Sequence, residues 1–163
     1  METLKTDALK FVALDTDDLE VVSAHVQDAE VKAADIHWIA AQKRLVLGID
    51  RFDWLAALAG EDGAAPAAPS FRRCRAALRF ERVLSCKCRG VDRNNPAATL
   101  SLLAVSFAPT DAPGGAIILT FSDGAVIRAE VECLEAELAD LGPAWPIAKC
   151  PLHETEDTPT AGH

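Results

Sequence analysis

The sequence lacks the features that mark a membrane-spanning or exported protein. No stretch approaches the roughly 18 consecutive apolar residues that suggest a membrane helix. The first twenty residues are rich in charged side chains, among them Asp15, Asp17 and Asp18, so they hold no apolar signal-peptide core. We therefore expect a cytoplasmic protein whose five cysteines are reduced thiols.

The sequence also lacks the short motifs of familiar catalytic sites. It contains no glycine-rich phosphate loop, no GxSxG, no HExxH and no CxxC. His25 and His37 have no motif partner nearby in the sequence, and each is more simply structural than catalytic. We therefore predict no cofactor, and we expect a binding domain rather than an enzyme.

Basic residues are scarce overall but concentrated in one segment. The chain has 16 basic and 25 acidic residues, and its net charge is −9. Residues 72–93 carry eight basic residues against two acidic ones, which leaves the rest of the chain at −15. So acidic a chain should repel nucleic acid and anionic lipid, except at that segment.

Hydrophobic periodicity indicates a single mixed domain. The 163 residues, half of them apolar, suffice for one sizeable core. Leu19, Val22 and Val26 predict a helix over Thr16–Asp28, which Asp15 would cap. Apolar patterns predict strands at 31–38 with a slip near 34–35, 45–49, 100–107, 117–121 and 125–131, and one long or two short strands over 74–80 and 84–88. Residues 9–14 could add an edge strand. A helical turn is expected at 53–58.

The end of the domain is predicted to be helical. Leu134, Leu138 and Leu141 fit helical spacing, and Gly142-Pro143 is a typical helix stop. We predict an α+β fold: an antiparallel sheet or split barrel of about six to seven strands, with an N-terminal and a C-terminal helix. Residues 99–142 are similar to the end of a pleckstrin-homology-like barrel. The predicted domain spans 1–148, with a flexible loop at 60–70 and a disordered acidic tail at 149–163.

The main candidate site is a cationic strand face. Apolar residues alternate with basic ones between positions 73 and 89, so the basic side chains share the face turned away from the core. The predicted binding residues are Arg73, Arg75, Arg79, Lys87 and Arg89. Arginine forks suit carboxylates and phosphates, so the hypothesis is a surface for an acidic protein partner. Nucleic acid is disfavoured because no aromatic residue lies on this face to stack bases.

Alternatives to this hypothesis remain open. The cationic face could instead be an ordinary solvated surface. Its positive charges would then be balanced by the acidic residues at 15–20, by Glu130 and Glu132, or by the tail. In that case Arg75→Glu with Arg79→Glu would leave association intact; the docking hypothesis instead expects lost association with thermal stability almost unchanged. Two copies of the chain could also associate through exposed sheet edges.

Two further groups of residues are candidate sites. Cys86 and Cys88, with Cys150 and His153, could bind zinc, although one intervening residue is tighter than usual and the two strand cysteines fit a buried face. Residues Asp50 and Asp53 flank Arg51, and with Trp38 and Trp54 these could line a ligand pocket between sheet and helices. Residues three apart in a strand point to opposite faces, so a capping turn beside a buried Trp54 is the simpler interpretation.

Several segments taken together resemble a known family. They are FVALDTDDLEVVSAHVQDA, KRLVLGIDRFDW, CRAALRFERVLSCKCRG, LSLLAVSFAP and IILTFSDGAVIRAEVECLEAELADLGPAW. These segments, from about Leu9 to Trp145, look like an uncharacterised alphaproteobacterial family that is classed only as a domain of unknown function. The resemblance implies a bacterial cytoplasmic protein, and it carries over no catalytic residue, cofactor or substrate.

Overall fold

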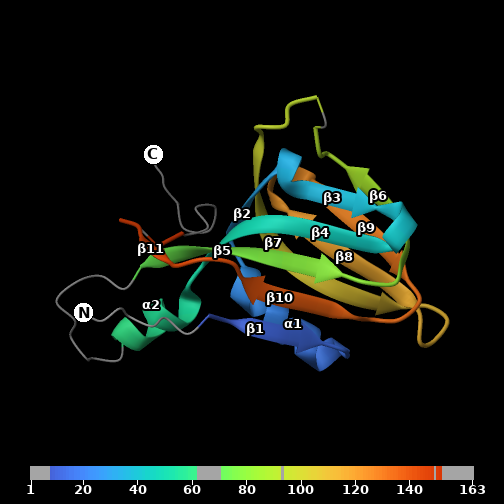
Figure 1. Ribbon diagram of the computed structural model, residues 1–163, viewed down its shortest axis with the longest axis horizontal. Helices are drawn as coiled ribbons and strands as arrows, with labels where there is room; N and C mark the ends of the chain where they lie inside the picture. The colour runs from blue at the N-terminus through green and yellow to red at the C-terminus, as the bar shows by residue number, and fades with distance from the viewer. Residues whose placement is uncertain (1–7, 62–70, 93, 149, 152–163) are drawn as a thin grey trace, which may run out of the picture.

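The computed structural model describes residues 8–61, 71–92, 94–148 and 150–151. The protein is dominated by short strands (Figure 1). In chain order the strands are β1 (Lys10–Ala13), β2 (Ala29–Lys32), β3 (Ile36–Ile39), β4 (Arg44–Phe52), β5 (Arg72–Phe80), β6 (Val83–Arg89), β7 (Thr99–Pro109), β8 (Gly115–Phe121), β9 (Val126–Val131), β10 (Ala136–Asp140) and β11 (Trp145–Pro146). Three 3₁₀ turns connect some of them: η1 (Ala33–Asp35), η2 (Ala40–Gln42) and η3 (Ser122–Gly124).

Two helices accompany the sheet, α1 (Thr16–Val26) and α2 (Trp54–Glu61). The first begins where the sequence predicts, because the Asp15 carboxylate accepts a hydrogen bond of 2.8 Å from the amide of Asp18. Its apolar stripe of Leu19, Val22 and Val26 is buried, mainly against β7. In the second, Asp53 plays the same capping part for the amide of Ala56, at 3.0 Å.

The strands form one antiparallel sheet. Their order is β1-β10-β5-β4-β2-β7-β8-β9-β6; β11 pairs with β5, and β3 pairs with β4. Strand β4 pairs along most of its length with β5, so β2 and β3 share its other edge. From there β2 continues to β7, whereas β3 pairs with no further strand of the described chain.

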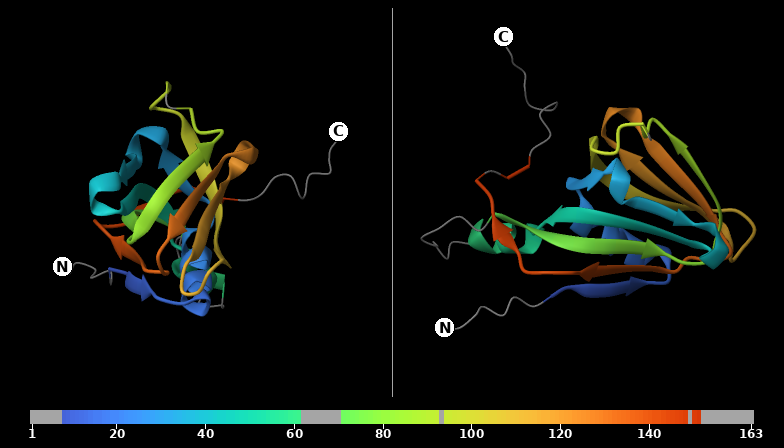
Figure 2. Two further views of the ribbon diagram at one scale, coloured as in Figure 1. Left: turned by 90° about the vertical axis from the view of Figure 1, so that its right-hand side faces the viewer. Right: turned by 45° about the horizontal axis from the view of Figure 1, so that its top comes forward.

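The sheet curves around a single apolar core (Figure 2). Phe52, Phe80 and Phe121 are its largest fully buried side chains, supported by leucines and isoleucines from β4, β5, β8 and β9. Helix α1 lies with β1 at the bottom of Figure 1, and β3 and β6 lie towards the top. The sheet is therefore open at β3 and β6, the side remote from α1.

Two parts of the predicted fold are wrong. The sheet has eleven strands rather than six or seven, partly because the predicted strand 31–38 is split by η1 into β2 and β3. The predicted C-terminal helix is strand β10, which pairs with β1 and β5. Residues 134, 136 and 138 are buried while their neighbours are half-buried, which is the two-residue period of a strand. Residues four apart lie on the same face in a strand and nearly so in a helix, so Leu134 and Leu138 fit both patterns. Helix α1 follows β1, so it does not open the fold.

Some predictions fall on residues outside the described ranges. These are most of the loop at 60–70 and most of the acidic tail at 149–163. Within the described ranges, neither helix has the length and apolar character needed to cross a membrane.

Candidate functional site

Arg75 faces away from the core, as predicted, but it forms ion pairs with two carboxylates of the same chain. Its guanidinium lies between Asp35 and Asp50, at 2.9 and 3.1 Å. It reaches them by crossing Gly48 of the neighbouring strand, where an added Cβ would lie 2.6 Å from Arg75 Nη2. The missing side chain at Gly48 therefore lets Arg75 lie flat across β4.

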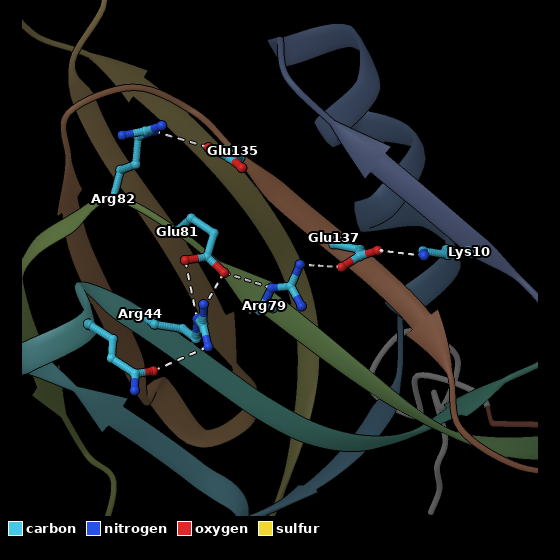
Figure 3. Close-up of polar contacts among 8 residues, drawn as sticks. Lys10, Arg44, Arg79, Glu81, Arg82, Glu135 and Glu137 are labelled. Carbon is cyan, nitrogen blue, oxygen red and sulfur yellow. Dashed lines mark hydrogen bonds and ion pairs between the residues drawn. The ribbon is translucent and has the colours of Figure 1, made fainter.

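Arg79 is also ion-paired with acidic neighbours. It contacts Glu137 of β10 and, at 2.8 Å, Glu81 at the end of its own strand (Figure 3). Glu81 also accepts from Arg44, and Glu137 lies 3.6 Å from Lys10. These side chains form one alternating row of charges across β1, β10, β5 and β4, so the outer face here is self-neutralised.

Arg73 is not on a free surface. Only 8% of the residue is exposed, and its Nη1 donates to the carbonyl oxygens of Asp50 and Asp28 at 2.9 and 3.2 Å. The guanidinium carbon also lies 6.0 Å from the centre of the Phe52 ring. Arg73 therefore ties β5 to β4 and to the start of β2, a structural role that its place in the alternating pattern did not indicate.

The predicted cationic residues do not form one strip. Lys87 and Arg89 belong to β6, which is the last strand in the order, far along the sheet from β5. Both are exposed and contact no carboxylate within the described ranges. Lys87 lies opposite Arg128 of β9, which is itself paired with Glu130 at 2.6 Å, so the excess positive charge of this edge comes from Lys87 and Arg89. Among the described residues, the carboxylates that pair with the arginines of β5 are Glu30, Asp35, Asp50, Asp53, Glu81 and Glu137, none of which was predicted for this role.

A cleft opens where β3 and β6 face each other across the open side of the sheet. It encloses about 330 Å³. Its lining consists of Ala33, Ala34, Ile36, Trp38, Leu45, Cys86, Cys88, Val91 and Pro96. These side chains come from β3, β6, the buried strand β4, the turn η1 and the loop after β6.

Main-chain hydrogen bonds close the cleft at both ends. At one end the amide of Val83 donates to the carbonyl of Lys43 at 2.9 Å, which holds the start of β6 beside the turn after β3. At the other end the amides of Ala33 and Ala34 donate to Ala98 and Pro96, at 2.9 and 3.0 Å. Between these closures β3 and β6 do not pair with each other: among the described strands β6 pairs with β9 and β3 with β4.

None of the described residues that line the cleft is charged. None carries an amide, a carboxylate or an imidazole, so the polar groups available there are main-chain groups, the indole N–H of Trp38 and the thiols of Cys86 and Cys88. Both cysteines are half-buried and pack against the edge of the core. Such a lining suits an apolar group and offers no side chain for acid–base chemistry.

A sequence comparison identifies the family. The sequence model of the family described as "Protein of unknown function (DUF2948)" matches residues 9–153. The chain belongs to the DUF2948 family. No curated protein and no solved structure gave a significant match. The family description names no activity, so the function of this DUF2948 chain has to be argued from its own residues.

The second predicted cluster is dispersed in this DUF2948 fold. Arg51 is buried and donates to both carboxylate oxygens of Asp140, at 2.8 and 2.9 Å. Asp53 caps α2 and accepts from Arg72 at 2.8 Å. Trp54 packs edge-on against Phe52 and donates from its indole nitrogen to the carbonyl of Gln27, at 3.0 Å. The capping role is confirmed, and these residues do not share a pocket with Trp38.

The buried Arg51–Asp140 pair shifts the pKa of its neighbours. Burial opposes ionisation of Asp140, but hydrogen bonds from Arg51 and from the Leu9 amide hold its pKa below the usual range. Burial and the charge of Arg51 lower the pKa of His25. Burial and the charge of Asp140 raise the pKa of the Cys74 thiol. The Arg51 and Asp140 side chains are buried, whereas His25 is half-buried at the edge of this cluster.

The zinc hypothesis finds no cluster in the described part of the chain. No three His, Cys, Asp or Glu side chains converge there as ligands for a metal ion. His153 lies outside the described residues. Cys86 and Cys88 instead line the cleft.

Sequence reasoning missed the cleft as a unit. Cys86 and Cys88 were assigned to a zinc site and Trp38 to a ligand pocket with Arg51 and Trp54, so the three were never placed together. Ile36 and Cys86 are 50 positions apart in the sequence. They line the same cleft because β3 and β6 border the open side of the sheet. One signal was present: Cys86 and Cys88 alternate with two cations on a strand, the pattern of a protected sheet edge.

Proposed function

We propose that this chain is a non-catalytic binding domain that takes an acidic protein partner at the cleft between β3 and β6. The observation that carries the proposal is the cleft itself, an apolar slot left where an otherwise continuous sheet fails to close. Exposed apolar surface next to two strand edges is typical of an interaction site. The pleckstrin-homology-like ending expected for residues 99–142 lends no support, because that comparison relied on a terminal helix where the chain forms β10.

Charge at the rim supports the acidic character of the partner. Lys87 and Arg89 project from the strand that carries Cys86 and Cys88, but from its opposite face. Of the five predicted binding residues, these two form no ion pair with a carboxylate of the described residues, whereas Arg73, Arg75 and Arg79 each do. A partner carboxylate would meet these two cations without breaking an ion pair of β5 or the Arg128–Glu130 pair of β9.

The lining argues against catalysis as the competing function. A catalytic site needs a general acid or base within reach of the bound group. The cleft offers two thiols and no imidazole or carboxylate to activate them. Its volume would also admit a small apolar ligand, and the experiment below separates that outcome from a protein partner.

A direct test uses the apolar anionic dye 8-anilinonaphthalene-1-sulfonate with the folded protein. We expect its fluorescence to rise with wild type and to rise much less with Cys88→Leu, whose larger side chain fills the cleft. Cys133→Leu makes the same change in the turn before β10 and should behave as wild type. Equal dye binding by all three proteins would remove the cleft as a site.

Partner capture from the native cell then tests the macromolecular part. Wild type is compared with Lys87→Glu/Arg89→Glu and with Lys10→Glu/Lys32→Glu, which makes the same change in net charge at exposed residues of other strands. The partner should be lost only from the first variant, and high salt should release it from wild type. A partner retained by both variants, or lost from both alike, would contradict the proposal.

A further inference from the structure

The cleft is bounded by the outer edges of two strands. β6 is seven residues long, and β3 is four. One edge of β6 pairs with β9 and one edge of β3 pairs with β4, and no strand of the described chain pairs with the edges between them. A strand rises about 3.3 Å per residue, so β6 offers an edge of about 20 Å, long enough for a short extended peptide.

The chemistry of the cleft favours an occupant with its own main chain. Any molecule that fills the cleft removes water from these strand edges, and buried backbone groups without partners cost free energy. The lining side chains supply no amide, carboxylate or imidazole that could substitute. An extended peptide provides donors and acceptors at strand spacing, whereas a purely apolar molecule does not.

Side-chain alternation along β6 sets the pattern of such a peptide. Cys86 and Cys88 point into the cleft, opposite Ile36 and Trp38 of β3. Lys87 and the next cation along, Arg89, point outward. A strand added beside β6 alternates in the same phase, so one set of its side chains enters the cleft and the other meets the cations.

From these relationships we infer that the cleft binds its partner by strand addition, taking an extended segment in which apolar and acidic residues alternate. The inference rests on the proposed function and specifies its mode. The apolar side chains fill the cleft beside Trp38, the acidic ones pair with Lys87 and Arg89, and the main chain hydrogen-bonds to a strand edge.

The test uses a synthetic heptapeptide of alternating valine and glutamate, with a fluorescent label, and measures its affinity by anisotropy. We expect saturable binding by wild type. N-methylation of alternate amides, prepared in both phases, should weaken binding at least tenfold in one phase, because it removes main-chain donors and leaves the side chains unchanged. A peptide of the same composition with the valines in one block should bind at least tenfold more weakly.

A charge exchange provides the matched control. Replacing the glutamates of the peptide by lysine should abolish binding to wild type, and Lys87→Glu/Arg89→Glu should restore it. Both residues are exposed, so the variant should fold as wild type does. Absence of binding by the valine–glutamate peptide, or equal binding of both N-methylated peptides and the parent, would overturn strand addition. Dye binding and partner capture that still depend on the cleft would then leave the proposed function standing.

Discussion

Arg51 and Asp140 form a buried, two-point ion pair that joins β4 to β10 across β5. The guanidinium donates to both carboxylate oxygens, at 2.8 and 2.9 Å, and the two side chains are 7% and 5% exposed. The same carboxylate accepts from the Leu9 amide at 2.8 Å, so it also fixes the chain just before the edge strand β1.

Removal of Asp140 should therefore be strongly destabilising. In Asp140→Ala the Arg51 charge stays buried without its partner, and we expect a loss of about 3–5 kcal/mol in the free energy of unfolding. Urea unfolding followed by circular dichroism measures this loss. Asp111→Ala, at an exposed turn, is the control and should change stability by less than about 0.5 kcal/mol. An equally small loss for Asp140→Ala would show that the pair is not buried in solution.

Stability should fall on acidification in two steps. The pKa of His25 is lowered in the folded state by burial and by Arg51, so the unfolded chain takes up its proton first, and stability declines as pH falls below about 6.5. The pKa of Asp140 is lowered as well, so its contribution is present above about pH 4 and is lost as pH falls further.

Thermal melting between pH 7 and 5 isolates the first step. Wild type should lose melting temperature over this range, and His25→Gln should lose less because the titrating group is gone. The same slope in both proteins would mean that His25 does not contribute, and a rise in stability towards pH 5 would contradict the assigned direction of its pKa.

Arg75→Glu should lower stability, contrary to the expectation from sequence alone. The new carboxylate would face Asp35 and Asp50, which now share the guanidinium, and we expect a cost of about 1–2 kcal/mol. Gly48→Val, which places atoms where Arg75 lies, should act in the same direction. Arg89→Glu, at an exposed position on β6 where no carboxylate of the described residues contacts the guanidinium, provides the comparison in chemical unfolding and should cost less. If Arg75→Glu were as stable as wild type, these ion pairs would not matter.

Occupation of the cleft should shield its thiols. Cys86 and Cys88 line it, whereas Cys133 lies in the turn between β9 and β10. With the valine–glutamate peptide bound, N-ethylmaleimide should modify the first two at least several-fold more slowly and Cys133 at an unchanged rate. Peptide-resolved mass spectrometry gives the three rates. Uniform slowing, or none, would place the bound peptide elsewhere.

Local signals explain how much of the fold the sequence predicts. Asp15 and the Leu19 stripe define α1 by contacts within one helix, and alternation alone identifies β4, β5 and β9. Arg82 interrupts the apolar alternation between residues 74 and 88, and it takes a positive φ of 59° between β5 and β6. The segment 133–141 misled because residues four apart share a face in both a helix and a strand. Only its pairing with β1 and β5 decides the outcome.

The site was less predictable because it depends on distant residues. Arg51 and Asp140 are 89 positions apart, and the cations of β5 find carboxylates on β10, on η1 and on β4. Alternation correctly placed Arg75, Arg79, Lys87 and Arg89 on the face turned from the core, but it carried no information on which of them would be neutralised. The structure shows that Arg75 and Arg79 of β5 are ion-paired, whereas Lys87 and Arg89 of β6 form no ion pair within the described residues.

The most direct measurement is amide hydrogen exchange, residue by residue, with and without the valine–glutamate peptide. We predict that protection rises in both β3 and β6, and that the amides of β7 and β8 exchange as before. Protection gained on other strands, with Ile36–Ile39 and Val83–Arg89 unchanged, would contradict the claim that these two edges form the binding site.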